Sequence, residues 1–473
     1  MKYLPCLVFL LSSGALAQST PIDAFLITDY NVPASSRNAA PLPPAPRPQS
    51  DSSVPASNAI PRNQSPSTTK ALTAQKAETL ALKNNPQISV ARLTALASRE
   101  VTREARSALW PQASADLTGV DSDPGSRITA GGLNNPIIYE RAAVGTTVTQ
   151  LITDFGRTAN LIASAKLAAK AQDQNAIATE EQVRLAADQA FYAALQAHAV
   201  TRVAEQTVNS RQTLTDQIQA LFNSKLKSQL DLSFANVNLS QAKLLLMDAQ
   251  SNENAAMAVL SAVLGFSNLQ DFQLVEDTNP VAAPPGNVDD LISQAFAHRP
   301  ELLAQNLEYE SAQRFHAAQR DLLFPTIRAA GAVGGTPVRN PVLSNWYGAV
   351  GVNIDIPIFN GFLYSARSRE AQLRAQAAQN RYKDLRNRIS RDVRTSWLNA
   401  TTAYNRLAVT KQLLDQANLA LDLAQTRYKL GLGSIVELSQ SQLQQTQAEI
   451  SNTQAGYDYR LALSNLRYQT AGP

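Results

Sequence analysis

The segment RYKLGLGSIVEL, residues 427–438, lies inside a stretch from Ile358 to Gly472 that contains no proline. Glycine is unfavourable inside a helix but suits a backbone reversal that needs a positive φ angle. Gly431 and Gly433 fall close together in this segment. We therefore predict that one long helix ends here and that the chain turns back on itself.

A coiled-coil pattern on both sides of the glycines supports this prediction. Apolar and small residues at alternating three- and four-residue spacing form a stripe along one face of a helix. Before the turn the stripe comprises Leu407, Thr410, Leu414, Ala417, Leu421, Ala424 and Tyr428, and after it Val436, Ser439, Leu443, Thr446, Ile450, Thr453 and Tyr457. Two stripes that meet at a Gly-x-Gly break predict an antiparallel helical hairpin.

The first half of the chain contains a second copy of this turn. LFNSKLKSQLDL, residues 221–232, aligns with the first segment so that Asp231 matches Glu437. Lysines stand where the glycines do, so only the repeat reveals this turn. The surrounding stretch 157–264 has neither glycine nor proline. Its first arm would be on the order of 100 Å long at about 1.5 Å per residue. Such long helices need to pack against neighbouring helices, because the narrow apolar stripe on each of them buries little apolar surface.

Short segments with period-two alternation precede each helical pair. In WYGAVGVNIDIPI, residues 346–358, apolar residues occupy the even positions and polar residues several of the odd ones. This alternation predicts a strand with one apolar and one polar face. The other three alternating segments are ASADLTG (113–119), ERAAVGTTVTQLI (140–152) and IRAAGAV (327–333). Each half of the chain thus contributes two predicted strands.

Paired prolines mark equivalent positions in the two halves. Asn85-Pro86 and Trp110-Pro111 in the first half correspond to Arg299-Pro300 and Phe324-Pro325 in the second. Self-similarity of this kind indicates an internal repeat. We therefore divide the chain into a first repeat, residues 70–287, and a second, residues 288–472. Each repeat comprises a helix, a β-hairpin and a long helical hairpin.

Aromatic residues gather at the ends of the predicted strands, as aromatic residues do at a membrane interface. They are Trp110, Tyr139, Phe155, Phe324, Trp346, Tyr347 and Phe359. A β-sandwich in water is the alternative, and it is disfavoured because four strands lie among very long helices that could not cover such a sheet compactly. We expect an α+β membrane protein with four transmembrane β-strands in each chain.

The strand count requires more than one chain. Four strands cannot close a barrel, and open sheet edges are not tolerated in lipid, so several chains must share one barrel. Two chains give a narrow eight-stranded barrel filled by side chains, whereas three give twelve strands and leave a lumen. The size of the barrel alone does not decide between three chains and four.

The N-terminus is typical of an exported protein. Residues 1–17 carry an early lysine, an apolar run and small residues before Gln18, which is the layout of a signal peptide. Its removal takes away Cys6, the single cysteine, so neither a disulfide nor a cysteine metal site is expected. Residues 18–69 follow as an arm rich in proline and serine, which we predict to be disordered.

The composition argues against several functions. The net charge of +4 is small and the basic residues are scattered, so no nucleic-acid partner is expected. No stretch approaches the length of an apolar transmembrane helix. Phosphate-loop and zinc-protease motifs are lacking, and His198, His298 and His316 have no spaced set of partners. We expect no enzyme activity, no cofactor and no metal site.

These features together resemble one family. The two-fold repeat, the proline pairs, the strand-ending segments QLITDFGR and PIFNGF, and RYKLGLGSIVEL resemble the TolC-type outer-membrane efflux factors over roughly residues 70–472. The resemblance implies a homotrimer with a shared twelve-stranded β-barrel in the outer-membrane lipid and a long periplasmic α-helical coiled-coil tunnel. It implies the exit duct of a tripartite efflux pump or type I secretion system, working with a periplasmic adaptor and an inner-membrane transporter.

The resemblance also assigns roles to the turn residues. Leu226, Lys227 and Ser228 in one turn, and Gly431, Leu432, Gly433 and Ser434 in the other, would contact the adaptor. Tyr428, Glu437 and Gln440 would line the tunnel constriction, where Glu437 matches a constriction aspartate and Tyr428 a tyrosine of the closing network. Two residues depart from the family pattern. Gly433 stands in place of an arginine and Gln440 in place of a second aspartate.

The expected location is the outer membrane, with most of the mass in the periplasm. A soluble periplasmic coiled-coil scaffold is the alternative function, in which the alternating segments pair in a small sheet. Such a protein would be released by osmotic shock without detergent. The sequence does not name the transported substrate.

Overall fold

The computed structural model describes residues 70–127, 137–276 and 282–472. The predicted signal peptide and Pro/Ser-rich arm lie outside the described residues. Contacts divide the described residues into two units. The larger unit comprises residues 70–118, 143–276, 282–337 and 344–472, and the smaller unit comprises residues 119–127, 137–142 and 338–343.

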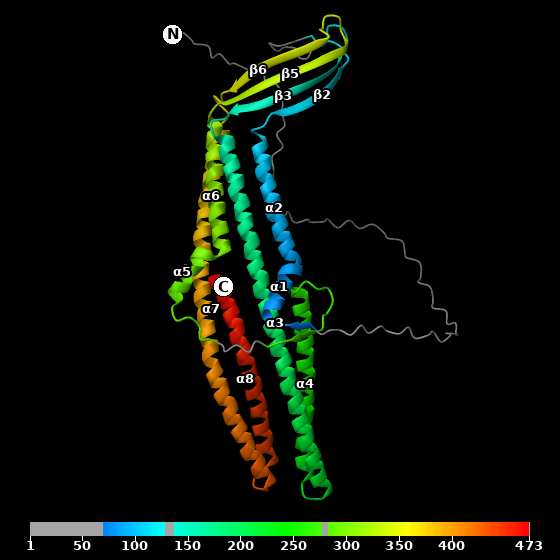
Figure 1. The fold of residues 1–473 in the computed structure, drawn as a ribbon, viewed down its shortest axis with the longest axis vertical. Coiled ribbons are helices and arrows are strands. Elements are labelled where there is room, and N and C mark those ends of the chain that lie inside the picture. Colours follow the sequence, from blue (N-terminus) through cyan, green and yellow to red (C-terminus); the bar gives the residue numbers. More distant parts are fainter. Residues whose placement is uncertain (1–69, 128–136, 277–281, 473) are drawn as a thin grey trace, which may run out of the picture. The chain divides into compact units, whose positions relative to one another are not determined.

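Long helices dominate the larger unit (Figure 1). The helices are α1 (Ala74–Asn84), α2 (Pro86–Ser107), α3 (Arg157–Asn223), α4 (Gln229–Val263), α5 (Val288–His298), α6 (Pro300–Arg320), α7 (Leu363–Lys429) and α8 (Ile435–Thr470), with a 3₁₀ turn at Asp321–Leu323. The strands are β1 (Lys70–Leu72), β2 (Gln112–Val120), β3 (Arg141–Thr153), β4 (Phe272–Leu274), β5 (Thr326–Arg339) and β6 (Trp346–Asp355). Helices α3 and α7 each contain 67 residues.

The four alternating segments form one sheet with the strand order β2-β3-β5-β6. Strands β5 and β6 pair antiparallel, from Thr326 opposite Asp355 to Gly335 opposite Trp346. The phenol ring of Tyr347 in β6 lies against Gly145 of β3 and Gly334 of β5. A Cβ atom at either glycine would clash with this ring. Glycine at these positions therefore makes room for an aromatic side chain on the sheet face.

Strands β2 and β6 are the edges of this sheet, and their side chains are largely exposed in the single chain. Val350 of β6 is 90% exposed and Leu117 of β2 is 85% exposed. An apolar face and two edges thus lack a partner within the described residues of one chain. Exposed apolar surface of this extent marks an interaction site.

The described part of the smaller unit consists of strand ends and connecting segments. Asp123, Pro124 and Gly125 form a turn in which Gly125 has a φ angle of +82°. Ser122 Oγ donates a hydrogen bond to the carbonyl oxygen of Ile138 (3.0 Å). The backbone N–H of Asn340 donates one to the carbonyl oxygen of Glu140 (3.1 Å).

A second, two-stranded sheet was not predicted. β1 and β4 pair in parallel, with Leu72 opposite Leu274, and each has only three residues. Such short strands carry too little alternation to be recognised. Leu72 is buried in a core with Phe191, Leu260, Leu264 and Tyr457, so this small sheet joins a cluster built from α1, α3, α4 and α8.

Both long helical pairs reverse in the same way. Helices α3 and α4 pack together, as do α7 and α8, and in Figure 1 both turns lie at the same end of the helices. Gly431 has a φ angle of +74°, and its counterpart Lys225 takes +59° although it is not glycine. Ser228 and Ser434 then cap α4 and α8, since their hydroxyls accept the N–H groups of Asp231 and Glu437.

The coiled-coil stripe predicted for α8 is wrong near the turn. Val436 and Leu443 are exposed, whereas Ile435, Leu438 and Gln442 are buried. The N-cap at Ser434 starts the helix at Ile435 and sets which face meets the neighbouring helices. The inward face is therefore shifted by one residue there, while Thr446 and Tyr457 of the predicted stripe are buried.

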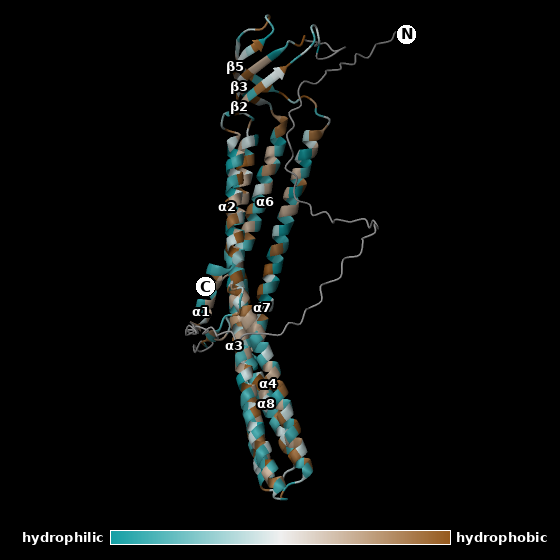
Figure 2. Ribbon diagram, turned by 90° about the vertical axis from the view of Figure 1, so that its right-hand side faces the viewer, coloured by the Kyte–Doolittle hydropathy of each residue, from teal (hydrophilic) through white to brown (hydrophobic). Residues whose placement is uncertain are grey.

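None of the helices in residues 70–127, 137–276 and 282–472 combines the length and apolar character needed to cross a membrane. Figure 2 shows hydrophilic and hydrophobic residues interspersed along α3, α7 and α8.

The positive φ angle at Gly431 gives a stability prediction. Replacing Gly431 with alanine should lower the stability by about 1 kcal/mol, because an L-residue is strained in the left-handed conformation. Gly456→Ala is the matched control, since Gly456 lies inside α8 with open space around its Cβ position. That change should raise stability by about 1 kcal/mol through helix propensity. The midpoint of guanidinium unfolding, followed by circular dichroism, measures both effects, and equal shifts would contradict the proposed turn geometry.

Candidate functional site: the two hairpin turns

The two helical hairpins pack against each other beside their turns. A buried cluster is formed by Ile218, Leu232, Ala235, Ala424, Tyr428, Ile435 and Leu438, which come from α3, α4, α7 and α8. Partly buried Leu214, Phe222, Phe234 and Leu421 pack around it. The structure therefore brings residues of both predicted turns into one site.

Tyr428 connects the second hairpin to the first. Its side chain is buried, and its hydroxyl donates to Asp231 Oδ1 at 3.4 Å. The ammonium nitrogen of Lys227 lies 3.8 Å from the centre of the Tyr428 ring, a cation–π contact. Burial, together with the negative charge of Asp231, raises the pKa of Tyr428 to about 12. The phenol is therefore a neutral donor at physiological pH.

Asp231 has two roles at the start of α4. Its Oδ2 accepts hydrogen bonds from the Ser228 N–H (3.1 Å) and the Ser228 hydroxyl (2.6 Å), which completes a capping box. Burial by itself would raise the pKa of Asp231, but the bonds from Ser228 and the charge of Lys227 outweigh it and hold the pKa below its ordinary value. Asp231 is thus a carboxylate that links a helix cap to the Tyr428 hydroxyl.

Glu437 is held within its own hairpin and not by the first one. Its Oε1 lies 3.3 Å from Nε of Arg427, and both side chains are substantially exposed. A Cβ atom at Gly433 would lie 3.2 Å from Cβ of Arg427 and 3.3 Å from Oε2 of Glu437. The absence of a side chain at Gly433 therefore leaves room for this ion pair. Gln440 is exposed on α8.

The outermost residues of the two turns are exposed. Leu226 is 71% exposed and Leu432, its counterpart in the repeat, is 70% exposed. Gly431 and Ser434 are also exposed, while Gly433 is half-buried. A leucine is thus presented to solvent at the same position of both turns.

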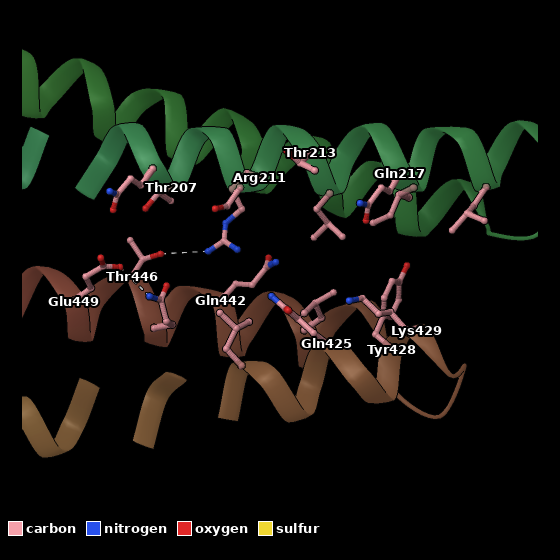
Figure 3. Close-up of a pocket in the computed structure, with 18 of the residues that line it drawn as sticks. Thr207, Arg211, Thr213, Gln217, Gln425, Tyr428, Lys429, Gln442, Thr446 and Glu449 are labelled. Carbon is pink, nitrogen blue, oxygen red and sulfur yellow. Dashed lines mark hydrogen bonds between the residues drawn. The ribbon is translucent and has the colours of Figure 1, made fainter. Parts of the chain in front are cut away.

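A groove opens between the hairpins next to this site (Figure 3). Its volume is about 710 Å³, and residues of α3, α7 and α8 line it. Arg211 of α3 reaches toward α8, where its guanidinium donates to Thr446 Oγ1 at 3.3 Å. Neither Arg211 nor Asp231 was predicted to be a functional residue. Arg211 is one of several basic residues of α3, so its residue type alone gave no signal.

Other titratable groups lie away from the turns. Glu78 of α1 has its pKa raised to about 7 by burial and by the nearby Asp188 of α3, whose own pKa burial also raises. His198 contacts Glu253, and His298 contacts a backbone carbonyl of its own helix. Among the described residues, no cluster of three His, Cys, Asp or Glu side chains could hold a metal ion.

Known proteins are similar to this chain in sequence and in fold. Outer membrane efflux protein BepC of Brucella suis biovar 1 (strain 1330) is 23% identical over 391 residues, which is 81% of either protein. Outer membrane protein TolC of Escherichia coli (strain K12) is 22% identical over 399 residues, 81% of this chain and 79% of TolC. The solved structure of CusC, described as forming a transmembrane channel, matches with a TM-score of 0.74 at 18% identity, over 85% of this chain and 92% of CusC.

These relatives define a class of outer-membrane channel proteins with the same fold. The sequence profile of the outer membrane efflux protein family matches residues 79–266 and 291–472, so the chain belongs to this family. The predicted resemblance and the predicted location in the outer membrane are confirmed. Family membership supports the role of an efflux duct.

The contact between Tyr428 and Asp231 can be tested with a double-mutant cycle. Tyr428→Phe and Asp231→Asn should each destabilise the protein, and the two effects should overlap by about 1 kcal/mol, because the first removes and the second weakens the same charge-assisted hydrogen bond. Tyr457→Phe is the control, since its hydroxyl bonds Glu276 elsewhere. Its effect should add to that of Asp231→Asn. Strict additivity for Tyr428 and Asp231 in chemical unfolding would contradict the link between the hairpins.

Proposed function

We propose that three copies of this chain form the exit duct of a tripartite efflux pump or type I secretion system. The observation that carries this proposal is the open four-stranded sheet, whose edge strands β2 and β6 and apolar face lack a partner within the described residues of one chain. In lipid every backbone hydrogen-bonding group must be paired. Neighbouring copies would pair β2 of one chain with β6 of the next.

Three copies would supply twelve strands, four from each chain. A barrel of that size leaves a lumen, whereas the eight strands of a dimer would be filled by side chains. The two repeats, residues 70–287 and 288–472, would each add one β-hairpin to the barrel and one helical hairpin to a periplasmic tunnel. Most of the mass would then lie in the periplasm, and the duct would conduct its substrate passively, without enzymatic activity.

The exposed turns suit contact with a periplasmic adaptor, which in turn would connect the duct to an inner-membrane transporter. Leu226 and Leu432 are apolar side chains left in solvent at matched positions of the two turns. Burying such side chains against a partner removes apolar surface from water and so contributes binding energy. Lys227, Ser228, Gly431, Gly433 and Ser434 would complete the two contact surfaces.

The residues behind the turns suit a constriction. In a trimer, Glu437 would recur by symmetry as a ring of three carboxylates, which favours cations and retards anions. Tyr428 would hold the two hairpins of each chain together through Asp231, and Gln440 would add a neutral ring where relatives carry a second acidic one. The closing network would thus rest on Tyr428 and Asp231 and on a single acidic ring.

Planar-bilayer recordings test the duct and its acidic ring together. The purified protein should form ion channels, and Glu437→Gln should lower their cation selectivity. Glu370→Gln, a change at an exposed position of α7, should leave the selectivity unchanged. Channels with unaltered selectivity would remove Glu437 from the constriction. Absence of channels, with release of the protein by osmotic shock, would favour the periplasmic scaffold instead.

The turn leucines give a test of adaptor binding. Leu226→Ser and Leu432→Ser should each weaken binding to the purified cognate adaptor at least tenfold, because the burial of an apolar side chain is lost. Both variants should keep the oligomer intact, since these side chains are exposed and lie outside the core. Leu373→Ser, at an exposed position of α7 away from the turns, is the control. Unchanged adaptor affinity in both turn variants would refute the assignment.

A further inference from the structure

Polar and apolar side chains line the groove between the two hairpins. Arg211, Gln442 and Thr446 lie near one another toward one end of the groove (Figure 3). The lining also includes Leu214, Leu221 and Leu421, whose side chains are at least partly exposed. Its volume of about 710 Å³ lies in the range of pockets that hold small organic molecules.

Arg211 is a buried cation beside this groove. It is only 8% exposed, and the ion pairs of the described residues do not include it. Burial lowers the pKa of Arg211 to about 10, so the guanidinium stays charged at neutral pH. A buried cation is costly unless an anion compensates it, and a planar guanidinium matches a carboxylate, phosphate or sulfonate group.

Gln442 faces the same space from α8. It is 4% exposed, and its Oε1 atom has no hydrogen-bond partner among the described residues. A buried amide normally makes its hydrogen bonds, so this one indicates an absent partner. Rotating the amide by half a turn would present its nitrogen as a second donor beside Arg211. The Thr446 hydroxyl already accepts from Arg211 and can donate its own proton.

The charges around the groove favour an anion as well. Lys227 and Lys429 line it together with Arg211, against one carboxylate, Glu449. Glu449 accepts a hydrogen bond from Gln445 at 2.8 Å. Positive charge in a concave site raises the local concentration of anions.

We propose that this groove binds an organic anion, with its charged group on Arg211, Gln442 and Thr446 and its apolar body on Leu214, Leu221 and Leu421. A small inorganic anion would satisfy the guanidinium but leave these leucines uncovered. A ligand in this position would contact α3 of the first hairpin and α8 of the second. Arg211, Gln442 and Thr446 lie apart from the exposed turn leucines Leu226 and Leu432, although Lys227 and Tyr428 line the same groove. The proposal does not depend on the proposed transport function.

Isothermal titration of the full-length, detergent-purified protein tests this site with 1-naphthoate as the probe. Its neutral analogue, 1-naphthalenemethanol, and inorganic phosphate are titrated alongside, each against a detergent blank. We expect saturable binding of naphthoate and at least tenfold weaker binding of the other two compounds. Arg211→Gln should weaken naphthoate binding at least tenfold, and Arg211→Lys should weaken it less, because it keeps the charge but loses the planar fork.

Arg202→Gln is the matched control, since it removes a cation from the same helix at a residue that does not line this groove. It should leave naphthoate binding unchanged. Circular dichroism and particle size show whether each variant is folded. The proposal is overturned if naphthoate does not bind, if the neutral analogue binds equally well, if phosphate alone binds, or if folded Arg211→Gln keeps the affinity of the original protein.

Discussion

Unpaired backbone groups on the edges of β2 and β6 are the constraint on which the rest of this structure depends. A four-stranded sheet has two edges, and within the described residues of one chain nothing covers them. In lipid the hydrogen bonds of those edges must be made by another strand. The same single chain leaves apolar residues such as Val350 exposed on the sheet face. Both features fit the proposed assembly of several copies in a membrane.

The helices also require several neighbours, because a 67-residue helix cannot bury its apolar surface against a single partner helix. Helix α3 contacts both α4 and α8, and Gln196 of α3 donates to Asp458 of α8 at 3.0 Å. Near the turns this contact becomes the buried cluster around Tyr428 and Leu438. The link between the hairpins thus ends where the proposed constriction and the proposed anion groove lie.

Sequence patterns could predict the elements but not the contacts between them. Period-two alternation and the repeated turn indicated the strands and both hairpins, because these signals are local. The pairing of Tyr428 with Asp231 joins residues far apart in the chain, and no pattern in either segment reports it. The left-handed Lys225 was hidden for a similar reason, since its residue type disfavours the conformation that the turn imposes. The shifted face of α8 arose from the position of the Ser434 cap.

The central claim is that the sheet of one chain is completed by its copies, and the mass of the purified particle tests it most directly. Light scattering with a correction for bound detergent gives the mass of the protein component. If three copies share the sheet, we expect a protein mass three times that of one processed chain. A particle containing a single chain, stable in detergent and still folded, would contradict it.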